Sequence, residues 1–187
     1  MQVGNLRNVW KGWAVLVAVY VSSGLCEENF EYRDDFHRYS VKYPATWPID
    51  TRSRERFKIT NYPPRAARRG GFPPPGGAWI DLGPKPEWLR KKTFDEWVTY
   101  RLSLLDSGLD RDQGETFSER RLALGPGCTE IRTTMKFGPD YWEEAFGCYF
   151  QSQSQDFSAA LAYKKGEPNA REFYRVYENF LRSFRRF

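Results

Sequence analysis

Hydrophobic residues recur at helical spacing near the end of the chain, between residues 169 and 187. Intervals of three and four residues place them on one face of an α-helix. Asn169 can cap this helix, and Glu172 three residues later completes a capping-box pattern. The pattern predicts an amphipathic helix that buries one side against the rest of the chain. The residues of the stripe are Phe173, Val176, Tyr177, Phe180, Leu181 and Phe184.

A second helix is predicted to start after Thr93. Thr93 is placed to cap it, and Glu96 completes a capping box. The helix is expected to end near Ser107 and Gly108. Its predicted buried side consists of Phe94, Trp97, Val98, Leu102 and Leu105.

Apolar and polar residues alternate in the segments before this helix, as is typical of half-buried strands. The clearest strand runs over residues 38–43 and is stopped by Pro44. Shorter strands are predicted at 56–60 and 78–82. The polar residues 27–38 are interpreted as a lead-in without regular structure.

Four further strands are predicted after the second helix, at residues 117–124, 129–137, 142–152 and 157–164. Glycine and proline residues between them favour tight turns, so the strands should form antiparallel hairpins. The order of elements predicts an α+β fold, an antiparallel sheet with helices packed on it.

The segment 61–77 is predicted to be a long loop, because residues 63–77 contain five prolines and four glycines. Such loops are often functional. Arg65, Arg68, Arg69 and Phe72 are therefore candidate partner-binding residues. A solvated insertion without a function explains the composition equally well.

The N-terminal residues 1–26 have the pattern of a signal peptide. Arg7 and Lys11 precede the unbroken apolar run 13–21, and small residues follow it. The run is short for a membrane span, but an uncleaved anchor remains open. Lipidation of Cys26 is disfavoured because Leu25 precedes it. The remainder, 27–187, is predicted to be a single exported domain, either secreted or periplasmic.

Composition supports a folded, water-exposed chain. Aromatic residues make up 17% of the 187 residues, and 28% are charged. Removal of residues 1–26 takes away two basic residues, Arg7 and Lys11, and no acidic one, which lowers the net charge from +5 to about +3. This excess is too small to indicate a nucleic-acid partner.

Two of the three cysteines, Cys128 and Cys148, flank one predicted hairpin and are a possible disulfide in an oxidising compartment. The alternation of side chains argues against it, if Ile131 lies opposite Phe146, because the two thiols then point to opposite faces. A direct cross-strand pair requires Ile131 opposite Ala145, or a bulge near the start of the strand. Two buried thiols are the alternative.

No residues have the spacing of a known catalytic or metal site. The single histidine, His37, has no serine in a nucleophile elbow to accompany it, so we expect it at the surface. Glu143 and Glu144 are adjacent on a strand and should point to opposite faces, on an edge or a wet surface. The acidic run from Asp106 to Glu115 matches a calcium loop only in part. No cofactor is predicted.

The segment 36–47 carries an aromatic-rich strand that ends in Tyr43-Pro44-Ala45-Thr46-Trp47. Together with the closing 180–184 segment, it resembles the PsbP-like superfamily, which includes photosystem II subunit P, the Ran-binding Mog proteins and bacterial exported relatives. The resemblance implies an α/β/α sandwich with helices on both faces of the sheet. It also implies a binding or assembly factor rather than an enzyme.

The sequence thus leads to an exported, non-catalytic binding or assembly domain with an unknown protein or anionic partner. Two alternatives stay open: a hydrolase whose residues converge from distant segments, and a membrane-tethered envelope component. A pocket with two or more titratable groups in contact would favour the hydrolase.

Overall fold

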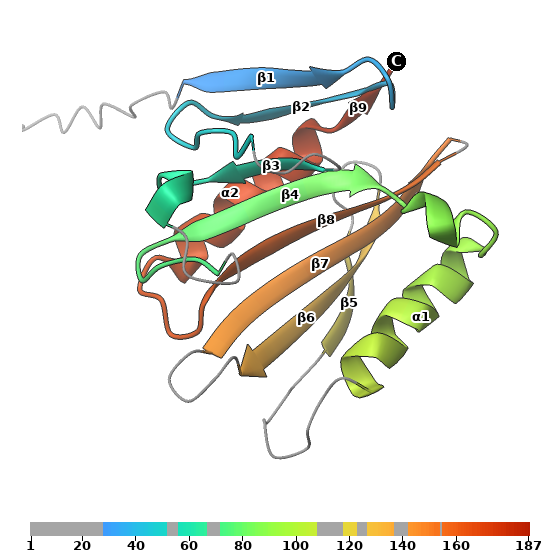
Figure 1. Ribbon diagram of the computed structural model, residues 1–187. Coiled ribbons are helices and arrows are strands. Elements are labelled where there is room, and N and C mark those ends of the chain that lie inside the picture. The colour runs from blue at the N-terminus through green and yellow to red at the C-terminus, as the bar shows by residue number, and fades with distance from the viewer. Residues whose placement is uncertain are drawn as a thin grey trace, which may run out of the picture.

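A computed structural model describes residues 28–51, 56–66, 72–107, 118–122, 127–136, 142–153 and 155–187 (Figure 1). The predicted signal peptide and the residues Arg68 and Arg69 lie outside these ranges. The strands and helices are β1 (Asn29–Asp34), β2 (Tyr39–Pro44), β3 (Phe57–Thr60), η1 (Pro64–Ala66), β4 (Ala78–Pro84), η2 (Glu87–Leu89), α1 (Phe94–Ser107), β5 (Ser118–Leu122), β6 (Cys128–Lys136), β7 (Trp142–Ser152), β8 (Gln155–Lys164), α2 (Ala170–Ser183) and β9 (Arg185–Arg186).

The strands form two antiparallel sheets, where the sequence predicted one. The smaller sheet has the order β1-β2-β9, and the larger has the order β3-β4-β8-β7-β6-β5. The predicted hairpins from β5 to β8 are confirmed, since each strand pairs with the next. The α+β class is confirmed as well.

The first strand, β1, was missed because the sequence analysis treated residues 27–38 as a lead-in. β1 pairs with β2 along its whole length, from Asn29 opposite Pro44 to Asp34 opposite Tyr39. Its side chains are exposed or half-buried. Backbone hydrogen bonds to β2 hold it in place, together with the ring of Tyr32, which stacks on that of Phe57 at 3.9 Å. The backbone bonds leave no hydrophobic pattern in the sequence.

Helix α2 joins the two sheets, and the predicted stripe forms its buried side. Phe180 stacks with Phe57 of β3, with ring centroids 6.2 Å apart, and Phe184 lies 5.7 Å from the ring of Tyr39 in β2. Each large buried side chain contributes about 1.5–3 kcal/mol of transfer free energy. The predicted cap is wrong, because the Asn169 side chain makes no capping hydrogen bond.

Helix α1 begins with the predicted capping box. The backbone N–H of Thr93 donates to Glu96 Oε2 at 2.6 Å, and the N–H of Glu96 donates to Thr93 Oγ1 at 3.2 Å. Trp97, which is 1% exposed, packs against Tyr149 of β7 at 5.3 Å between ring centroids. Tyr149 points to the face of β7 opposite to its neighbour Phe150, whose ring contacts Phe184 beside α2.

Cys128 and Cys148 form a disulfide between β6 and β7, with Cα atoms 5.7 Å apart. The strand phase assumed in the sequence analysis was wrong. Ile131 pairs with Gly147, so Cys128 and Cys148 share a face and meet diagonally across the ladder. Over the described ranges, no helix has the length and apolar character needed to cross a membrane.

Candidate functional site

A cavity of about 140 Å³ lies at the seam between the two sheets. We call it the seam cavity. The β1–β2 hairpin supplies one wall, and the residues around β3 supply the other. It is lined by Tyr32, Asp34, His37, Tyr39, Ile49, Asp50, Thr51, Arg56, Phe57, Lys58 and Pro84.

His37 lines the seam cavity, whereas the sequence analysis placed it at the surface. Its side chain is 27% exposed, and Nδ1 lies 2.8 Å from Oδ2 of Asp34. A carboxylate only accepts hydrogen bonds, so Nδ1 carries the donated proton. The turn between β1 and β2 brings the two side chains together, with the His37 backbone N–H also donating to Asp34. This is a pair of titratable groups in contact, the feature set out above as favouring a hydrolase.

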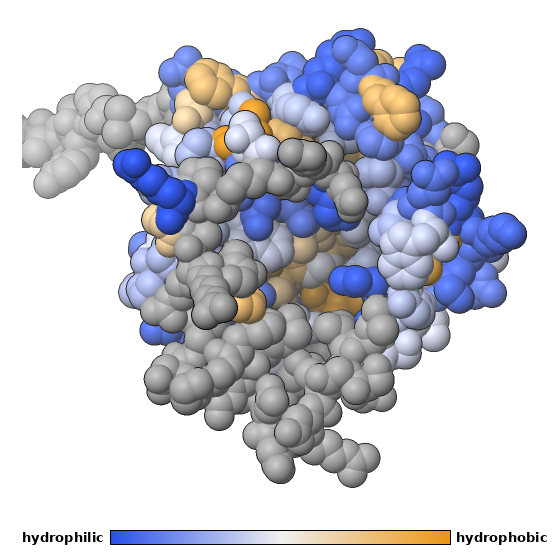
Figure 2. Space-filling model, in the orientation of Figure 1, coloured by the Kyte–Doolittle hydropathy of each residue, from blue (hydrophilic) through white to orange (hydrophobic). Residues whose placement is uncertain are grey.

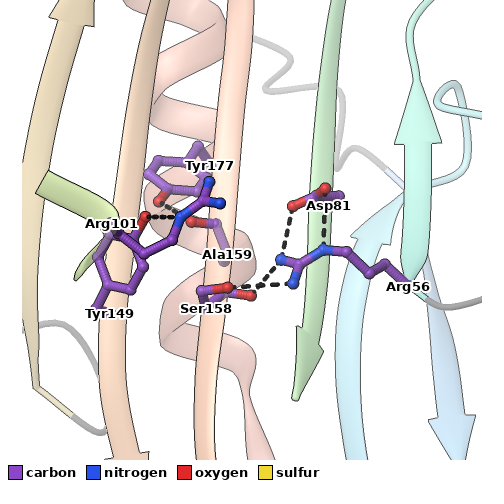
Figure 3. A network of polar contacts seen from close by, with 7 residues as sticks. All are labelled: Arg56, Asp81, Arg101, Tyr149, Ser158, Ala159 and Tyr177. Atoms are coloured by element: carbon purple, nitrogen blue, oxygen red, sulfur yellow. Dashed lines mark hydrogen bonds and ion pairs between the residues drawn. The ribbon is translucent and has the colours of Figure 1, made fainter. Parts of the chain in front are cut away.

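Arg56 extends from the seam cavity to a polar network on β4 and β8 (Figure 3). Its guanidinium donates to Asp81 through Nε and Nη2, and to Ser158 through Nη1 and Nη2. Burial alone would lower the pKa of Arg56, but the Asp81 carboxylate outweighs this effect and raises it. Figure 3 also shows Arg101 of α1 reaching Tyr149 on β7, where Nε lies 3.4 Å from the hydroxyl.

The face of the larger sheet that is turned to the viewer in Figure 2 is hollowed. Figure 2 shows hydrophobic residues at the bottom of a hollow in the middle of this face, with hydrophilic residues on part of its rim. Gly147 and Ala160 pair on this face and are half-buried. Neither residue has a side chain beyond Cβ, and the ring of Tyr149 lies beside Gly147.

A larger hollow of about 430 Å³ lies on the other face, where the N-terminal half of α2 stands beside β6, β7 and β8. We call it the α2 groove. Its floor comes from three neighbouring strands, and α2 forms one wall. The lining residues are Glu130, Arg132, Glu144, Phe146, Tyr163, Ala170, Arg171 and Tyr174.

Three aromatic rings surround the floor of the α2 groove. The ring of Phe146 lies 4.9 Å from that of Tyr174 and 6.1 Å from that of Tyr163. The guanidinium of Arg132 lies 5.4 Å from the centre of the Phe146 ring. Arg132 therefore already makes a cation–π contact inside the groove.

Two buried carboxylates complete the α2 groove. Glu130 is 3% exposed and accepts a hydrogen bond of 2.8 Å from the Tyr174 hydroxyl. Glu144 is 7% exposed and forms an ion pair with Arg132. Burial, together with the charge of Glu144, raises the pKa of Tyr163, which keeps its hydroxyl protonated.

The sequence analysis placed Glu143 and Glu144 on an edge or a wet surface, and this is wrong. They do point to opposite faces, but both are buried because β7 lies between β6 and β8 inside the sheet. A carboxylate on a central strand is the signal that could have revealed the groove, because buried charges are rare unless they have partners. The predicted hairpins already placed β7 between β6 and β8, but the sequence analysis did not apply this to the two glutamates.

The predicted partner-binding loop is described in part. Arg65 is exposed in η1, and Phe72 is half-buried. The base of the loop is fixed, because the Asn61 side chain donates to the carbonyl of Gly76 and accepts from the N–H of Ala78. The N–H of Gly76 also donates to Glu167, just before α2. The loop therefore returns to the sheet close to the α2 groove.

Within the part of the chain that the structure describes, no three His, Cys, Asp or Glu side chains are placed to hold a metal ion.

No protein-family model and no curated protein matches the sequence. Several solved structures are similar in fold. One is a crystal structure from Bacteroides thetaiotaomicron VPI-5482, with a TM-score of 0.51 and 12% identity over 84% of this chain. The alignment covers 48% of that chain, so this protein spans about half its length.

Two other matches belong to proteins that the sequence resemblance named. The Ran-binding protein Mog1p of Saccharomyces cerevisiae has a TM-score of 0.49 and 9% identity, over 85% of this chain and 95% of that chain. Cyanobacterial PsbP (CyanoP) from Synechocystis sp. PCC 6803 has a TM-score of 0.43 and 12% identity, over 94% of this chain and 98% of that chain. Structures of both kinds of protein are thus among the matches, as the resemblance led us to expect.

Proposed function

We propose that the chain is an exported, non-catalytic binding or assembly domain that engages a protein partner at the α2 groove. The observation that carries this proposal is the groove itself, an open hollow of about 430 Å³ with three aromatic rings and two buried carboxylates in its lining. Apolar surface with a few fixed polar groups is typical of binding sites. Aromatic residues and arginine are also the residues enriched at protein interfaces.

Site-specific photocrosslinking tests this function. A photoreactive phenylalanine analogue at Arg171, on the rim of the groove, should capture one protein in the native host. The same analogue at Phe36, an exposed residue of the β1–β2 turn, is the matched control. We expect mass spectrometry to identify adducts from position 171. These adducts should disappear when unlabelled protein is added as a competitor. Equal capture from both positions would argue against the groove.

The loop 61–77 is a second candidate surface, through Arg65, Arg68, Arg69 and Phe72. Arginine side chains suit an anionic partner, and the base of the loop lies next to α2. Replacement of the three arginines by alanine should leave the melting temperature unchanged and weaken the captured complex. If the triple variant captures the partner as well as the parent protein does, the loop is not the contact surface and the α2 groove remains the candidate.

We further propose that residues 27–187 are the mature domain, with helices on both faces of the larger sheet, and that residues 1–26 are a signal peptide. The contact between Trp97 and Tyr149 supports the placement of α1 opposite α2. N-terminal sequencing of the protein from its native host separates a cleaved leader from a retained membrane anchor.

The seam cavity favours a second class of function, the hydrolase. Asp34 and His37 are in hydrogen-bond contact there, and Arg56 and Lys58 add positive charge. An Asp–His pair can act as a general base on a water molecule. Ester, phosphoester and amide substrates should therefore be screened with the His37→Ala variant as the blank. Turnover that depends on His37 would replace the binding proposal.

A further inference from the structure

We infer that the α2 groove binds the side chain of a basic residue, arginine or lysine, presented by the partner protein. This inference rests on the proposed function and adds the chemistry of the ligand. It also assigns a role to Arg132 of the chain itself, which occupies the groove in the unbound protein and is displaced when the partner binds.

The floor of the groove matches a cation better than an anion. Glu130 and Glu144 are both less than a tenth exposed, whereas the side chains of Arg132 and Arg171 are exposed. An anion that entered the groove would meet two carboxylates at close range, and like charges repel. A cation would meet those carboxylates and the faces of aromatic rings, the two groups that bind guanidinium and ammonium ions.

Arg132 shows that the floor accepts a guanidinium. It lies directly opposite Phe146 in the β6–β7 ladder, and its guanidinium both covers the Phe146 ring and pairs with Glu144. Its side chain is nevertheless 54% exposed, while that of Glu144 is 10% exposed. Ion pairs with an exposed partner contribute little to stability, so an incoming cation can replace Arg132 without unfolding the site.

The position of the groove also suits a residue on another protein. Its open side lies between the β6–β7 ladder and the first turns of α2, so a partner backbone can pass along the rim beside Arg171. The volume of about 430 Å³ is large enough for one long basic side chain.

Small probes test the ligand chemistry without the partner. N-acetyl-arginine amide should bind the full-length mature chain, as measured by NMR titration, and the neutral isostere N-acetyl-citrulline amide should bind at least about tenfold more weakly because it lacks the charge. N-acetyl-glutamate amide should not bind. Binding of the citrulline or glutamate probe as strong as that of the arginine probe would overturn the inference.

Variants of the groove test the role of Arg132. Arg132→Ala should tighten binding of the arginine probe about three- to tenfold, because the internal competitor is removed. Glu144→Gln should weaken it about tenfold or more. Arg175→Ala and Glu172→Gln change exposed residues of α2 outside the groove. These two variants should bind the arginine probe as strongly as the parent protein does. If Arg132→Ala weakens binding, then Arg132 is part of the binding site rather than its occupant, and the inference fails.

Phe146→Leu gives an independent test if Glu144→Gln does not fold. It keeps an apolar side chain on the floor and removes the ring, so the arginine probe should lose affinity while the melting temperature changes little. Unchanged affinity would exclude the cation–π contact. Crosslinks from position 171 in the absence of any probe binding would disprove only this inference and leave the proposed binding function intact.

Discussion

Arg56 and Asp81 form a bidentate ion pair at the junction of β3 and β4, with donor–acceptor distances of 3.1 Å from Nε and 2.9 Å from Nη2. Their side chains are 26% and 19% exposed. The same guanidinium donates to the hydroxyl and carbonyl of Ser158 on β8. The pair thus links the segment before β3 to two strands of the larger sheet.

Replacement of Asp81 by asparagine should destabilise the protein by about 2–3 kcal/mol, because it removes the negative charge that the half-buried guanidinium of Arg56 contacts through Nε and Nη2. Urea unfolding measures the change. Asp35→Asn is the matched control, since its ion pair with Arg33 is 79% and 61% exposed and should contribute about 0–1 kcal/mol. If both variants lower the free energy of unfolding by the same amount, burial of the Arg56–Asp81 ion pair does not add to its contribution.

The disulfide should stabilise the protein by about 2–4 kcal/mol, because it closes a loop in the unfolded chain between residues 20 positions apart. The double variant Cys128→Ala/Cys148→Ala should therefore unfold at lower urea concentration. Dithiothreitol should lower the stability of the parent protein toward that of the variant and leave the variant unchanged. Two alkylatable thiols in the native protein would refute the bridge.

Glu143 should make stability fall as the pH rises. Burial, only partly offset by Lys58, raises the pKa of Glu143 to about 7. Between the unfolded pKa near 4.5 and this value, the folded protein holds a proton that the unfolded chain has lost. The free energy of unfolding should therefore decrease with rising pH across this window, by about 2–4 kcal/mol in total.

Glu143→Gln should abolish the decrease in the free energy of unfolding with rising pH. The variant should therefore be more stable than the parent at pH 8 and about as stable at pH 4. Urea unfolding at both pH values is the measurement. Glu172→Gln, an exposed change on α2, serves as the control and should follow the parent at each pH. A parallel pH profile for Glu143→Gln and the parent would show that Glu143 ionises at its ordinary pKa.

Trp97 should be the main anchor of α1 on the sheet. It is 1% exposed and packs with Leu89, Ile131 and Tyr149 in a cluster separate from the main core. Trp97→Ala should cost about 3–5 kcal/mol through the cavity that it leaves. Trp97→Phe should cost much less, because Nε1 of Trp97 has no hydrogen-bond partner among the residues that the structure describes.

Trp88 provides the comparison, since its side chain is 69% exposed. Trp88→Ala should change the free energy of unfolding by about 0.5 kcal/mol or less, as measured by urea unfolding. A larger effect than that of Trp97→Ala would mean that α1 is held mainly through η2.

The local features of this protein could be predicted because they depend on neighbours in the sequence. The stripe from Phe173 to Phe184 and the capping box at Thr93 follow from helical spacing, and both are observed. Asn169 and Glu172 have the same spacing as Thr93 and Glu96, but the Asn169 side chain makes no capping hydrogen bond. Here the geometry of the turn after β8, which the sequence does not show, decided the outcome.

By itself, the sequence determined the α+β class, the order of the hairpins and the helix that joins the sheets, because these follow from the period of the hydrophobic pattern. Only the tertiary structure decided which register β6 takes on β7, and hence that Glu130, Glu144 and Phe146 share one floor. A shift of one residue in register would exchange the two faces of a strand. Contacts between distant segments set that register, so no local pattern could reveal the α2 groove. Asp34 and His37 are only three residues apart, but their place at the seam cavity also depends on residues around β3 and β4 that line it.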